Sequence, residues 1–477
     1  MEPNTQSAGL GGEDVGGELS RREMLRMMGA VAGVSVLAPE LFAEQDPASL
    51  PRPRRIRYIK PKQPVTAVIV GHGARGSLYG GFAQAMPDEW KIVGVAEPIE
   101  YRRDAAIRLH GIAPEHAFVT WEHVFGVPKF ADVVIVTTPD KLHHGPAMAA
   151  LAQGYDLLLE KPIATSWREC RDILVRANEK KAIVAVCHVL RYAPYFQQMK
   201  AVVESGMLGD VVSVQHLEPV GHLHMSHSFV RGNWRNSKES SPIILSKSCH
   251  DLDILRWVID RPCRRVSSFG SLSFFCRQNA PEGAPQYCIE GCPVEEKCPY
   301  HAPNVYVYKK QWGTEHIVSE DRSDEGILKA LRTSQYGRCV FQSDNDVCDH
   351  QVTNMEFDGG VTAAFSLEGM TSYGGRRTRI FCKQGDIVGD ENALDVFDFV
   401  RGARTRWDVS RAAEDLSGHG GGDFRLVRDF IQAVTRRDVD LLTSNLATSM
   451  ESHLIAFRAE ESRNGGGKVL GVDLASR

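Results

Sequence analysis

The sequence predicts a protein of two domains, the first of which is a doubly wound α/β domain on a parallel sheet. Its 477 residues, of which 43% are hydrophobic and 24% charged, are typical of an ordinary globular protein with two or three domains. The apolar, β-branched stretch 65–70 breaks into a glycine-rich turn. Strand-like and helix-like stretches then alternate up to residue 188, as they do in βαβ units.

The first 64 residues indicate an exported protein. A polar, glycine-rich start is followed by Arg21 and Arg22, by an apolar stretch that reaches Phe42, and by Ala43 as a cleavage point. A basic region, a short apolar region and a small residue are typical of an export signal. The paired arginines resemble a twin-arginine signal, and the alternative is a membrane-anchored or amphipathic helix. We predict a signal over 1–43, a linker with five prolines over 44–64, and a periplasmic or otherwise exported protein.

The overall charge argues against two classes of partner. The formal net charge is −4 and the isoelectric point is about 6.5. Nothing in this balance attracts nucleic acid or an anionic membrane surface. Beyond the N-terminal segment, no run of about 18 apolar residues occurs, so we expect no stable membrane insertion once the signal is removed.

The turn from Gly71 to Gly76 follows the pattern Gly-x-Gly-x-x-Gly. After a strand and before a helix, the first glycine permits the bend, the second lets the backbone approach a pyrophosphate, and the third lets the helix pack on the strand. The next strand, 90–96, ends at Glu97, and an acid there accepts hydrogen bonds from the adenine ribose and repels a 2′-phosphate. We therefore predict NAD rather than NADP, with Arg102 or Arg103 to hold a phosphate if NADP binds instead.

Two further strands end in polar residues. The stretch 131–136 is followed by Thr-Thr-Pro and then by His143, and the stretch 156–159 is followed by Glu160 and Lys161. Because the carboxyl ends of parallel strands face the cofactor crevice, we expect these side chains beside the nucleotide. The predicted cofactor-binding residues are Gly71, His72, Gly73, Arg75, Gly76, Glu97, Thr137, Thr138, Pro139, His143, Glu160 and Lys161.

These motifs carry a resemblance to a known family. Thr-Thr-Pro-x-x-x-His, followed by Gly-x-x-x-Leu-Leu-Glu-Lys-Pro-Ile-Ala, resembles the Gfo/Idh/MocA oxidoreductases over roughly residues 65–270. The resemblance implies a Rossmann domain over 65–188 and, over 189–477, an α+β domain with an open, mainly antiparallel sheet for substrate binding and oligomerisation. It also implies a sugar or cyclitol substrate, a homo-oligomer, and a place for Lys161 beside the nicotinamide and the reacting carbinol.

The family pattern Asp-x-x-x-His, with a second Asp three residues later, is only partly present. His250 and Asp253 match it, but Ser246 stands where the upstream Asp is expected, with Lys247 beside it. Ser246 can hydrogen-bond a hydroxyl but cannot carry a negative charge. Just past the strand 182–188, Arg191 and Tyr192 are expected to face the cleft, with a salt bridge and a core aromatic as the alternative. The predicted substrate residues are Arg191, Tyr192, Ser246, Lys247 and Asp253.

The chemistry of alcohol oxidation predicts the catalytic roles of His250 and Lys161. A proton acceptor must reach the hydroxyl, and an imidazole titrates near neutral pH, so His250 is the predicted base. As an ammonium, Lys161 would stabilise the developing alkoxide, and with a lowered pKa it could share the proton. The expected function is hydride transfer between a sugar or cyclitol secondary alcohol and NAD. The alternatives are a glycosidase that oxidises its sugar transiently with bound NAD, and a non-catalytic sugar-binding protein; Lys161 favours net oxidation.

Two groups of side chains remain outside this scheme. Cys276, Cys288, Cys292 and Cys298 lie in a segment rich in Pro and Gly, over 276–301, which has little apolar content and needs a staple. The four thiolates predict a structural zinc site, with two disulfides or an iron–sulfur cluster as alternatives. His419-Gly-Gly-Gly precedes Asp423, which is expected to cap the helix that follows.

Overall fold

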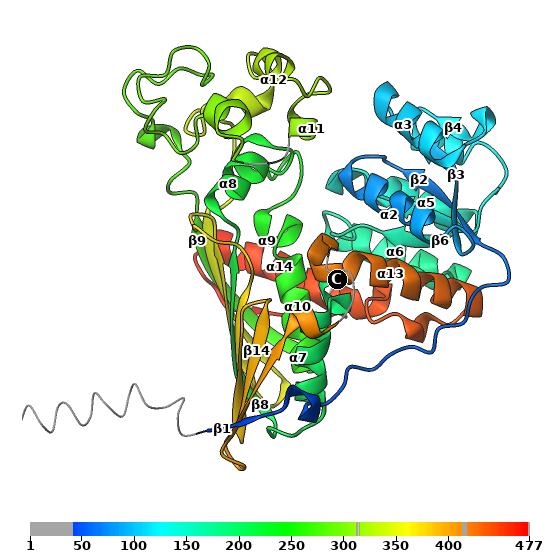
Figure 1. Ribbon diagram of the computed structural model, residues 1–477, viewed down its shortest axis with the longest axis vertical. Coiled ribbons are helices and arrows are strands. Elements are labelled where there is room, and N and C mark those ends of the chain that lie inside the picture. Colours follow the sequence, from blue (N-terminus) through cyan, green and yellow to red (C-terminus); the bar gives the residue numbers. More distant parts are fainter. Residues whose placement is uncertain (1–41, 312, 314, 413–416, 476–477) are drawn as a thin grey trace, which may run out of the picture.

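The computed structural model describes residues 42–311, 313, 315–412 and 417–475, and Figure 1 shows two domains side by side. The predicted export signal therefore lies outside the described residues, apart from its last two positions. No helix of the described chain is long and apolar enough to cross a membrane.

The first domain is the predicted parallel sheet. Among the described residues, six strands are ordered β4-β3-β2-β5-β6-β7, and every neighbouring pair is parallel. Their central positions are buried Val, Ile and Leu, as expected for strands covered on both faces. The strand order reverses between β2 and β5, where doubly wound sheets bind ligands. The strands are β2 (Val65–Val70), β3 (Trp90–Ala96), β4 (Ala117–Phe118), β5 (Val133–Val136), β6 (Asp156–Leu159) and β7 (Val184–Val186).

Helices cover both faces of this sheet, and some come from the far end of the chain. Apolar residues of α13 (Ser417–Arg436) complete the core on one face, and Leu446 and Met450 of α14 (Leu446–Asn464) join the core on the other. The two domains are therefore interleaved in sequence. The other helices of this domain are α2 (Ala74–Ala85), α3 (Glu100–His110), α4 (Trp121–Val124), α5 (His144–Ala152) and α6 (Trp167–Lys180).

The second domain is an open, mainly antiparallel sheet, which confirms the predicted fold class. Within the described residues ten strands are ordered β1-β15-β14-β13-β12-β8-β11-β10-β9-β16, and only β1–β15 and β8–β11 are parallel pairs. Helices α7 (Pro194–Glu204), α10 (Cys249–Ile259) and α14 lie between this sheet and the first domain (Figure 1). The strands are β1 (Ala43–Gln45), β8 (Val211–Pro219), β9 (Cys263–Ser271), β10 (His350–Phe357), β11 (Thr362–Glu368), β12 (Arg377–Cys382), β13 (Gly385–Gly389), β14 (Ala393–Asp398), β15 (Ala403–Asp408) and β16 (Leu470–Gly471).

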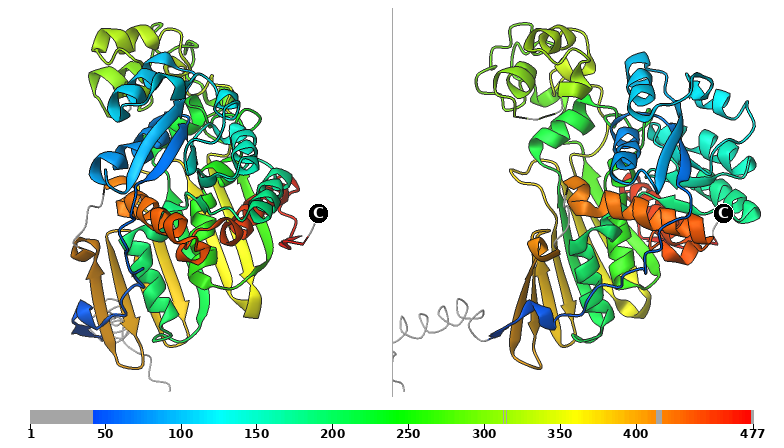
Figure 2. Two further views of the ribbon diagram at one scale, coloured as in Figure 1. Left: turned by 90° about the vertical axis from the view of Figure 1, so that its right-hand side faces the viewer. Right: turned by 45° about the vertical axis from the view of Figure 1, so that its right-hand side comes forward.

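The segment predicted as a linker, 44–64, is fixed to both domains. It begins within β1 at the edge of the large sheet, and Leu50 is buried in the core of the second domain. Further on, the backbone of Ile59 both donates to and accepts from the side-chain amide of Gln432 in α13, at 2.9 and 2.8 Å. This segment is therefore a strap across the molecule, as the blue chain in Figure 2 shows.

A long insertion separates β9 from β10. Its described residues form short helices, including α11 (Glu315–Val318) and α12 (Asp324–Ala330), and it lies at the top of Figure 1. The cysteine-rich part, predicted over 276–301, is the first portion of this larger unit.

Candidate active site

The glycine turn has the geometry that a dinucleotide site requires. Gly71 has φ +94°, a left-handed conformation that favours glycine, and a Cβ there would lie 2.7 Å from the carbonyl oxygen of Thr137. A Cβ on Gly76 would lie 2.1 Å from the carbonyl oxygen of Gly71. These two glycines are therefore required by the close contact between strand, turn and helix.

Gly73 is different, because no close contact with the described residues requires a glycine there. It is the N-cap of α2, with φ −77° and ψ −160°, which any residue adopts. A Cβ there would meet only the Nη1 atom of Arg102, at 4.0 Å, among the described atoms. A glycine beside open space at a helix N-terminus fits the close approach of a phosphate group. The turn therefore fits the pyrophosphate of a dinucleotide.

Glu97 stands at the end of β3, as predicted, and its carboxylate organises the turn. It accepts a hydrogen bond from the backbone N–H of His72 at 2.7 Å and another from Ile99 at 3.0 Å. Arg103 donates to the Glu97 carbonyl oxygen at 2.8 Å, and Arg102 lies near Gly73. Glu97, Arg102 and Arg103 thus lie together at the end of β3, where we expected the adenine ribose to bind.

The ends of β5 and β6 are connected by His143. Its Nε2 lies 2.9 Å from the carbonyl oxygen of Thr138, and its Nδ1 lies 2.6 Å from that of Pro162. Thr137 donates to the carbonyl oxygen of Gly71 at 2.6 Å, which connects β5 to the glycine turn. His143 therefore positions the segment that carries Lys161.

Arg75 and Glu160, predicted to bind the cofactor, are part of an internal ion network. Arg75 lies 2.6 Å from the Glu160 carboxylate and 2.5 Å from that of Asp423 in α13. Glu160 also accepts from Tyr79 at 2.8 Å. Asp423 was expected to cap its helix, but α13 begins at Ser417, so Asp423 lies inside the helix and pairs with Arg75 instead. These charges hold α2, β6 and α13 together below the cofactor site.

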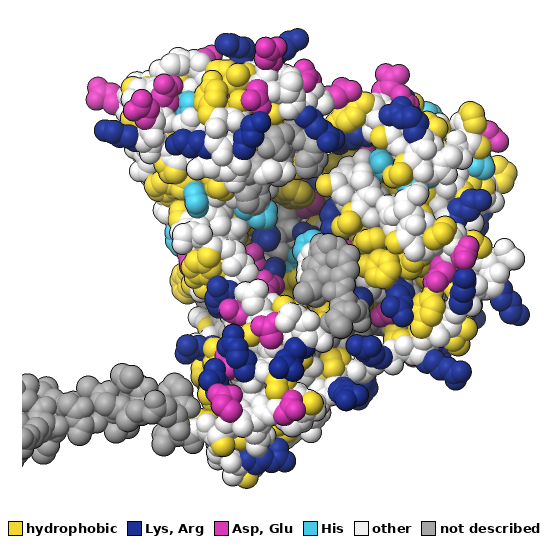
Figure 3. Space-filling model, viewed as in Figure 1, with side chains coloured by type: hydrophobic (Ala, Val, Ile, Leu, Met, Phe, Trp, Pro, Cys, Tyr) yellow, Lys and Arg dark blue, Asp and Glu magenta, His cyan; other side chains and the backbone are white. Residues whose placement is uncertain are grey.

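The two predicted catalytic residues come from different domains, which Figure 3 shows on either side of a recess, and the two residues lie close together. Lys161 follows β6, and its Nζ donates to the backbone carbonyl oxygen of Ser246 at 2.5 Å. His250 is the second residue of α10 and is 5% exposed. Figure 3 shows the recess, with histidine and charged side chains in it.

His250 is held in its neutral form. Burial lowers its pKa well below 6.5, and the nearby charge of Lys161 lowers it further, followed by smaller contributions from His419 and His188. In the described part of the chain, its Nδ1 has no hydrogen-bond partner. A neutral imidazole can accept a proton, and the ammonium of Lys161 disfavours a second positive charge close by.

Ser246 and Lys247, both predicted to bind the substrate, make different contacts in the structure. Ser246 contributes its carbonyl to Lys161, while its hydroxyl lies 3.3 Å from the carbonyl oxygen of Pro242. Lys247 forms an ion pair with Glu218 of β8 at 3.1 Å, and Glu218 also pairs with Arg376 at 2.7 Å. The charges of Lys247 and Glu218 therefore neutralise each other, so this part of the structure is polar but carries no unpaired charge from either residue.

Three predicted substrate residues are internal instead. Arg191 makes a two-pronged ion pair with Asp253, at 2.6 Å for both contacts, and their side chains are 3% and 1% exposed. The Tyr192 hydroxyl lies 3.1 Å from that of Ser444 and is buried. The prediction that these residues face the substrate is wrong, and the alternative of a salt bridge and a core aromatic is correct. A short turn, 189–192, directs them inward, which strand position alone does not reveal.

Histidines that the sequence did not assign to the site surround Lys161 and His250. The rings of His188 and His419 lie 5.9 and 5.8 Å from that of His250. His224 lies close to Lys247, Lys161 and His419, and burial, followed by Lys247, lowers its pKa well below 6.5. The cluster of histidines in the sequence around 216–227 was the available signal, but only the fold shows that His224 lies near Lys161.

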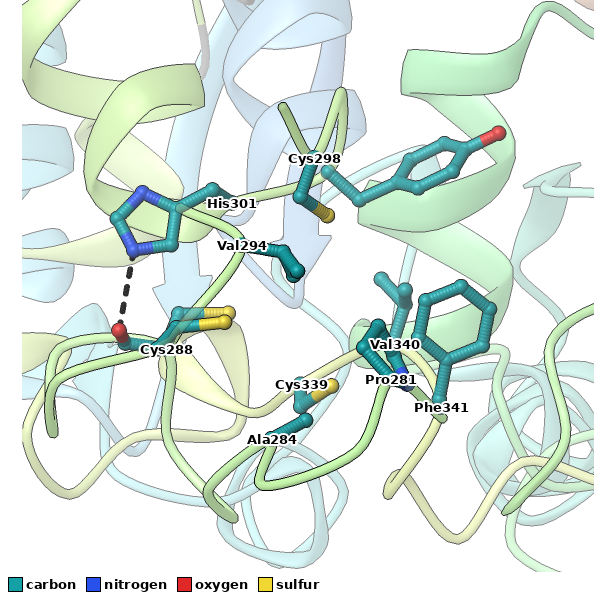
Figure 4. A pocket seen from close by; sticks show the side chains of 11 residues that line it. Pro281, Ala284, Cys288, Val294, Cys298, His301, Cys339, Val340 and Phe341 are labelled. Atoms are coloured by element: carbon teal, nitrogen blue, oxygen red, sulfur yellow. Dashed lines mark hydrogen bonds between the residues drawn. The ribbon is translucent and has the colours of Figure 1, made fainter. Parts of the chain in front are cut away.

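The four cysteines predicted to bind a metal do not all lie together. Cys288, Cys292 and Cys298 line one small cavity, together with Cys339, which lies far along the chain (Figure 4). The thiol of Cys276 instead donates to the backbone carbonyl oxygen of Ser273 at 3.3 Å. Among the described residues, no three His, Cys, Asp or Glu side chains are arranged to hold a single metal ion, so a structural zinc site gains no support.

The fold and the cofactor turn define the class, an oxidoreductase with a nucleotide-binding Rossmann domain, and comparisons with known proteins agree. Residues 65–188 match the family described as "Oxidoreductase family, NAD-binding Rossmann fold", and residues 196–281 match the "GFO/IDH/MocA C-terminal domain". These two stretches of the chain are therefore similar to the two domains of Gfo/Idh/MocA oxidoreductases. The second match ends at residue 281, within the insertion that follows β9.

Individual relatives are distant. The chain is 24% identical to "Putative oxidoreductase YteT" of Bacillus subtilis over 69% of this chain and 78% of that protein. It is 26% identical to "Inositol 2-dehydrogenase/D-chiro-inositol 3-dehydrogenase" of Lactiplantibacillus plantarum over 42% of this chain and 52% of that protein. An inositol dehydrogenase homologue from Azotobacter vinelandii, solved with NAD+, shares the fold, with a TM-score of 0.62, 16% identity, and 87% and 100% of the two chains covered.

Proposed function

We propose that this protein is an NAD-dependent dehydrogenase that transfers a hydride between a secondary alcohol of a sugar or cyclitol and NAD. The observation that carries the proposal is that Lys161, at the end of β6 of the nucleotide-binding sheet, lies close to a buried His250 whose pKa is lowered. The dehydrogenases among the relatives named above act on inositols, which supports a polyhydroxylated ring as the substrate class.

When bound, NAD supplies the hydride acceptor. The residues of this chain then divide the proton chemistry between them. His250 takes the hydroxyl proton while the carbon–hydrogen bond breaks, so the alcohol becomes a ketone and two electrons leave with the hydride. Lys161 stabilises the developing alkoxide through its ammonium group, which the carbonyl oxygen of Ser246 orients. Lys247 and Glu218 hold the opposite wall polar and fit neutral hydroxyl groups of the substrate.

Cofactor choice is tested by calorimetric titration with NAD and NADP. We expect NAD to bind more tightly, because the Glu97 carboxylate repels a 2′-phosphate. An Arg102→Ala variant is the matched control, since it should leave NAD binding nearly unchanged and further weaken NADP. Tighter binding of NADP to the wild type would contradict the assignment.

Export remains a proposal, based on the paired arginines at positions 21 and 22. A double substitution to lysine should keep the precursor in the cytoplasm, folded and able to bind nucleotide. Normal export of that variant would contradict a twin-arginine route. The predicted homo-oligomer likewise remains a prediction, which light scattering of the purified protein tests.

The rival activity is glycoside cleavage with transient oxidation. The wild type is incubated with NAD and a panel of inositols, aldoses and aryl glycosides, and both NADH and released sugar are measured. We expect NADH from free polyols or sugars. Release of sugar from glycosides without net NADH would favour the glycosidase instead.

A further inference from the structure

A groove of about 710 Å³ lies between the strap and the helices α7 and α13, which the strap crosses in Figure 1. We call it the basic groove. Residues 51–57 of the strap form one side of it, and residues of α7, α10 and α13 contribute to the rest. Eight cationic side chains and three carboxyl groups line it, although the whole chain has a formal net charge of −4. The proposed dehydrogenase chemistry uses none of these charged residues.

The strap is held in place at both ends of the groove. The carbonyl oxygen of Pro51 accepts a hydrogen bond from the side-chain amide of Gln198 in α7 at 2.8 Å. At the other end, Ile59 is bound to Gln432 in α13 through the two hydrogen bonds described above. The backbone between these contacts is therefore fixed on both sides. It carries four exposed arginines, which are Arg52, Arg54, Arg55 and Arg57.

Helix α13 brings more arginines to the same groove. Arg425, Arg428 and Arg436 all line it, although more than 350 positions separate them from the strap in sequence. Arg428 is held over the ring of Tyr58 in the strap, with 4.6 Å between the guanidinium carbon and the ring centre. Cations from two distant segments thus converge on one concave surface, which an accidental run of basic residues in the sequence does not explain.

The carboxyl groups in the groove offset little of this charge. Glu204 lies 3.7 Å from Arg54, and their side chains are 36% and 88% exposed, so water screens the pair. Burial raises the pKa of Asp429 to about 7, although Arg428 and Arg425 lower it, so this carboxyl is only partly ionised at neutral pH. Arginine side chains stay charged, and their mutual repulsion favours an anion between them.

The shape of the groove and its aromatic residues distinguish between anionic partners. A concave groove admits a chain, whereas a flat bilayer touches only its rim. Single-stranded nucleic acid stacks its bases on aromatic rings. Here, however, Arg191 and Lys200 lie over the ring of Trp257 at 5.8 and 5.9 Å, and Arg428 lies over Tyr58. Guanidinium groups match the paired oxygens of a carboxylate, which favours a chain that carries carboxylates.

We propose that the basic groove binds an acidic polysaccharide, a chain of uronate sugars whose carboxylates pair with the arginines of the strap and of α13. Its volume lies within the roughly 300–1,000 Å³ of ordinary ligand sites. Binding there holds the protein on an anionic glycan, and no bond is made or broken. The proposal does not depend on the dehydrogenase activity, because the charged residues of the groove take no part in hydride transfer.

The test is calorimetric titration of the purified protein with a short alginate, which is a chain of uronate sugars. We expect binding that weakens as salt is added, because the contacts join exposed charges. A dextran of the same length, which carries no charge, should not bind. Single-stranded DNA and vesicles that contain anionic lipid are titrated alongside. Absence of alginate binding, or tighter binding of the DNA or of the vesicles, would overturn the proposal.

Two matched double variants locate the site. Arg52→Gln with Arg57→Gln removes two charges from the groove, and we expect alginate to bind roughly tenfold more weakly. Lys60→Gln with Lys62→Gln removes the same charge from the strap outside the groove and should bind as the wild type does. All four side chains are exposed, so equal melting temperatures should show that both variants fold. Equal alginate affinity of the two double variants would refute the site. Arg436→Gln in α13 is an independent check, and wild-type affinity in that variant would refute the part of α13.

Discussion

Replacing His250 with alanine removes the proposed proton acceptor with little damage to its surroundings. The ring is buried, and in the described structure its Nδ1 has no hydrogen-bond partner that the change would leave unsatisfied. Loss of a general base typically costs ~10²–10⁴ in rate, which is about 2.7–5.4 kcal/mol of activation free energy. We expect kcat to fall by this factor while NAD affinity stays the same, since the glycine turn lies on the other domain.

The lowered pKa of His250 also predicts how the rate changes with pH. Proton acceptance requires neutral His250, and burial together with Lys161 lowers its pKa below 6.5. The wild-type rate should therefore hold as the pH falls through 6.5 and decline only below it, rather than near neutrality as the sequence alone suggests. Stopped-flow absorbance of NADH measures the rate, with His350→Ala, at the start of β10, as the control. A wild-type rate in His250→Ala, or an unchanged acid limb in that variant, would refute the reasoning.

Three further predictions concern binding, catalysis and stability. Gly73→Val should weaken NAD binding without lowering the melting temperature, whereas Gly81→Val on the same helix should leave binding intact; equal affinities in calorimetry would contradict this. Lys161→Ala should keep NAD affinity but lose rate in a single turnover, and a wild-type rate would remove its role. Stability should fall as the pH drops from 6.5 to 5, because burial lowers the pKa of His188 to about 3 and that of His453 to about 4. Between pH 6.5 and 5 the unfolded chain binds protons that the folded chain does not, so the free energy of unfolding should fall by at most about 1.4 kcal/mol per pH unit for each group. A free energy of unfolding in urea that does not change between these pH values would contradict the assignment.

The sequence predicted the first domain well because its signals are local. An apolar strand, a glycine turn and a helix start within a dozen residues, and the structure confirms the parallel sheet that they imply. His143 follows β5, and its Nδ1 lies 2.6 Å from the carbonyl oxygen of Pro162, next to Lys161 at the end of β6; the binding of the cofactor by these residues stays a prediction.

The predictions that were wrong depend on contacts between distant segments. Arg191 and Asp253 were expected in the cleft, but their mutual ion pair is satisfied only when α10 packs on the turn that follows β7. Asp423 was read as a helix cap because its partner, Arg75, is hundreds of residues away. Cys339 was not grouped with the other cysteines for the same reason, since backbone hydrogen bonds between 286–288 and 337–339 bring it to Cys288.

The central claim is net hydride transfer, and isotope transfer tests it most directly. A cyclitol deuterated at its carbinol carbons is mixed with the purified protein and NAD, and the nucleotide is analysed by mass spectrometry after a single turnover. The account predicts reduced nicotinamide that carries one deuterium, with little of it in His250→Ala. Labelled substrate that is converted while the nucleotide pool stays oxidised and unlabelled would contradict it.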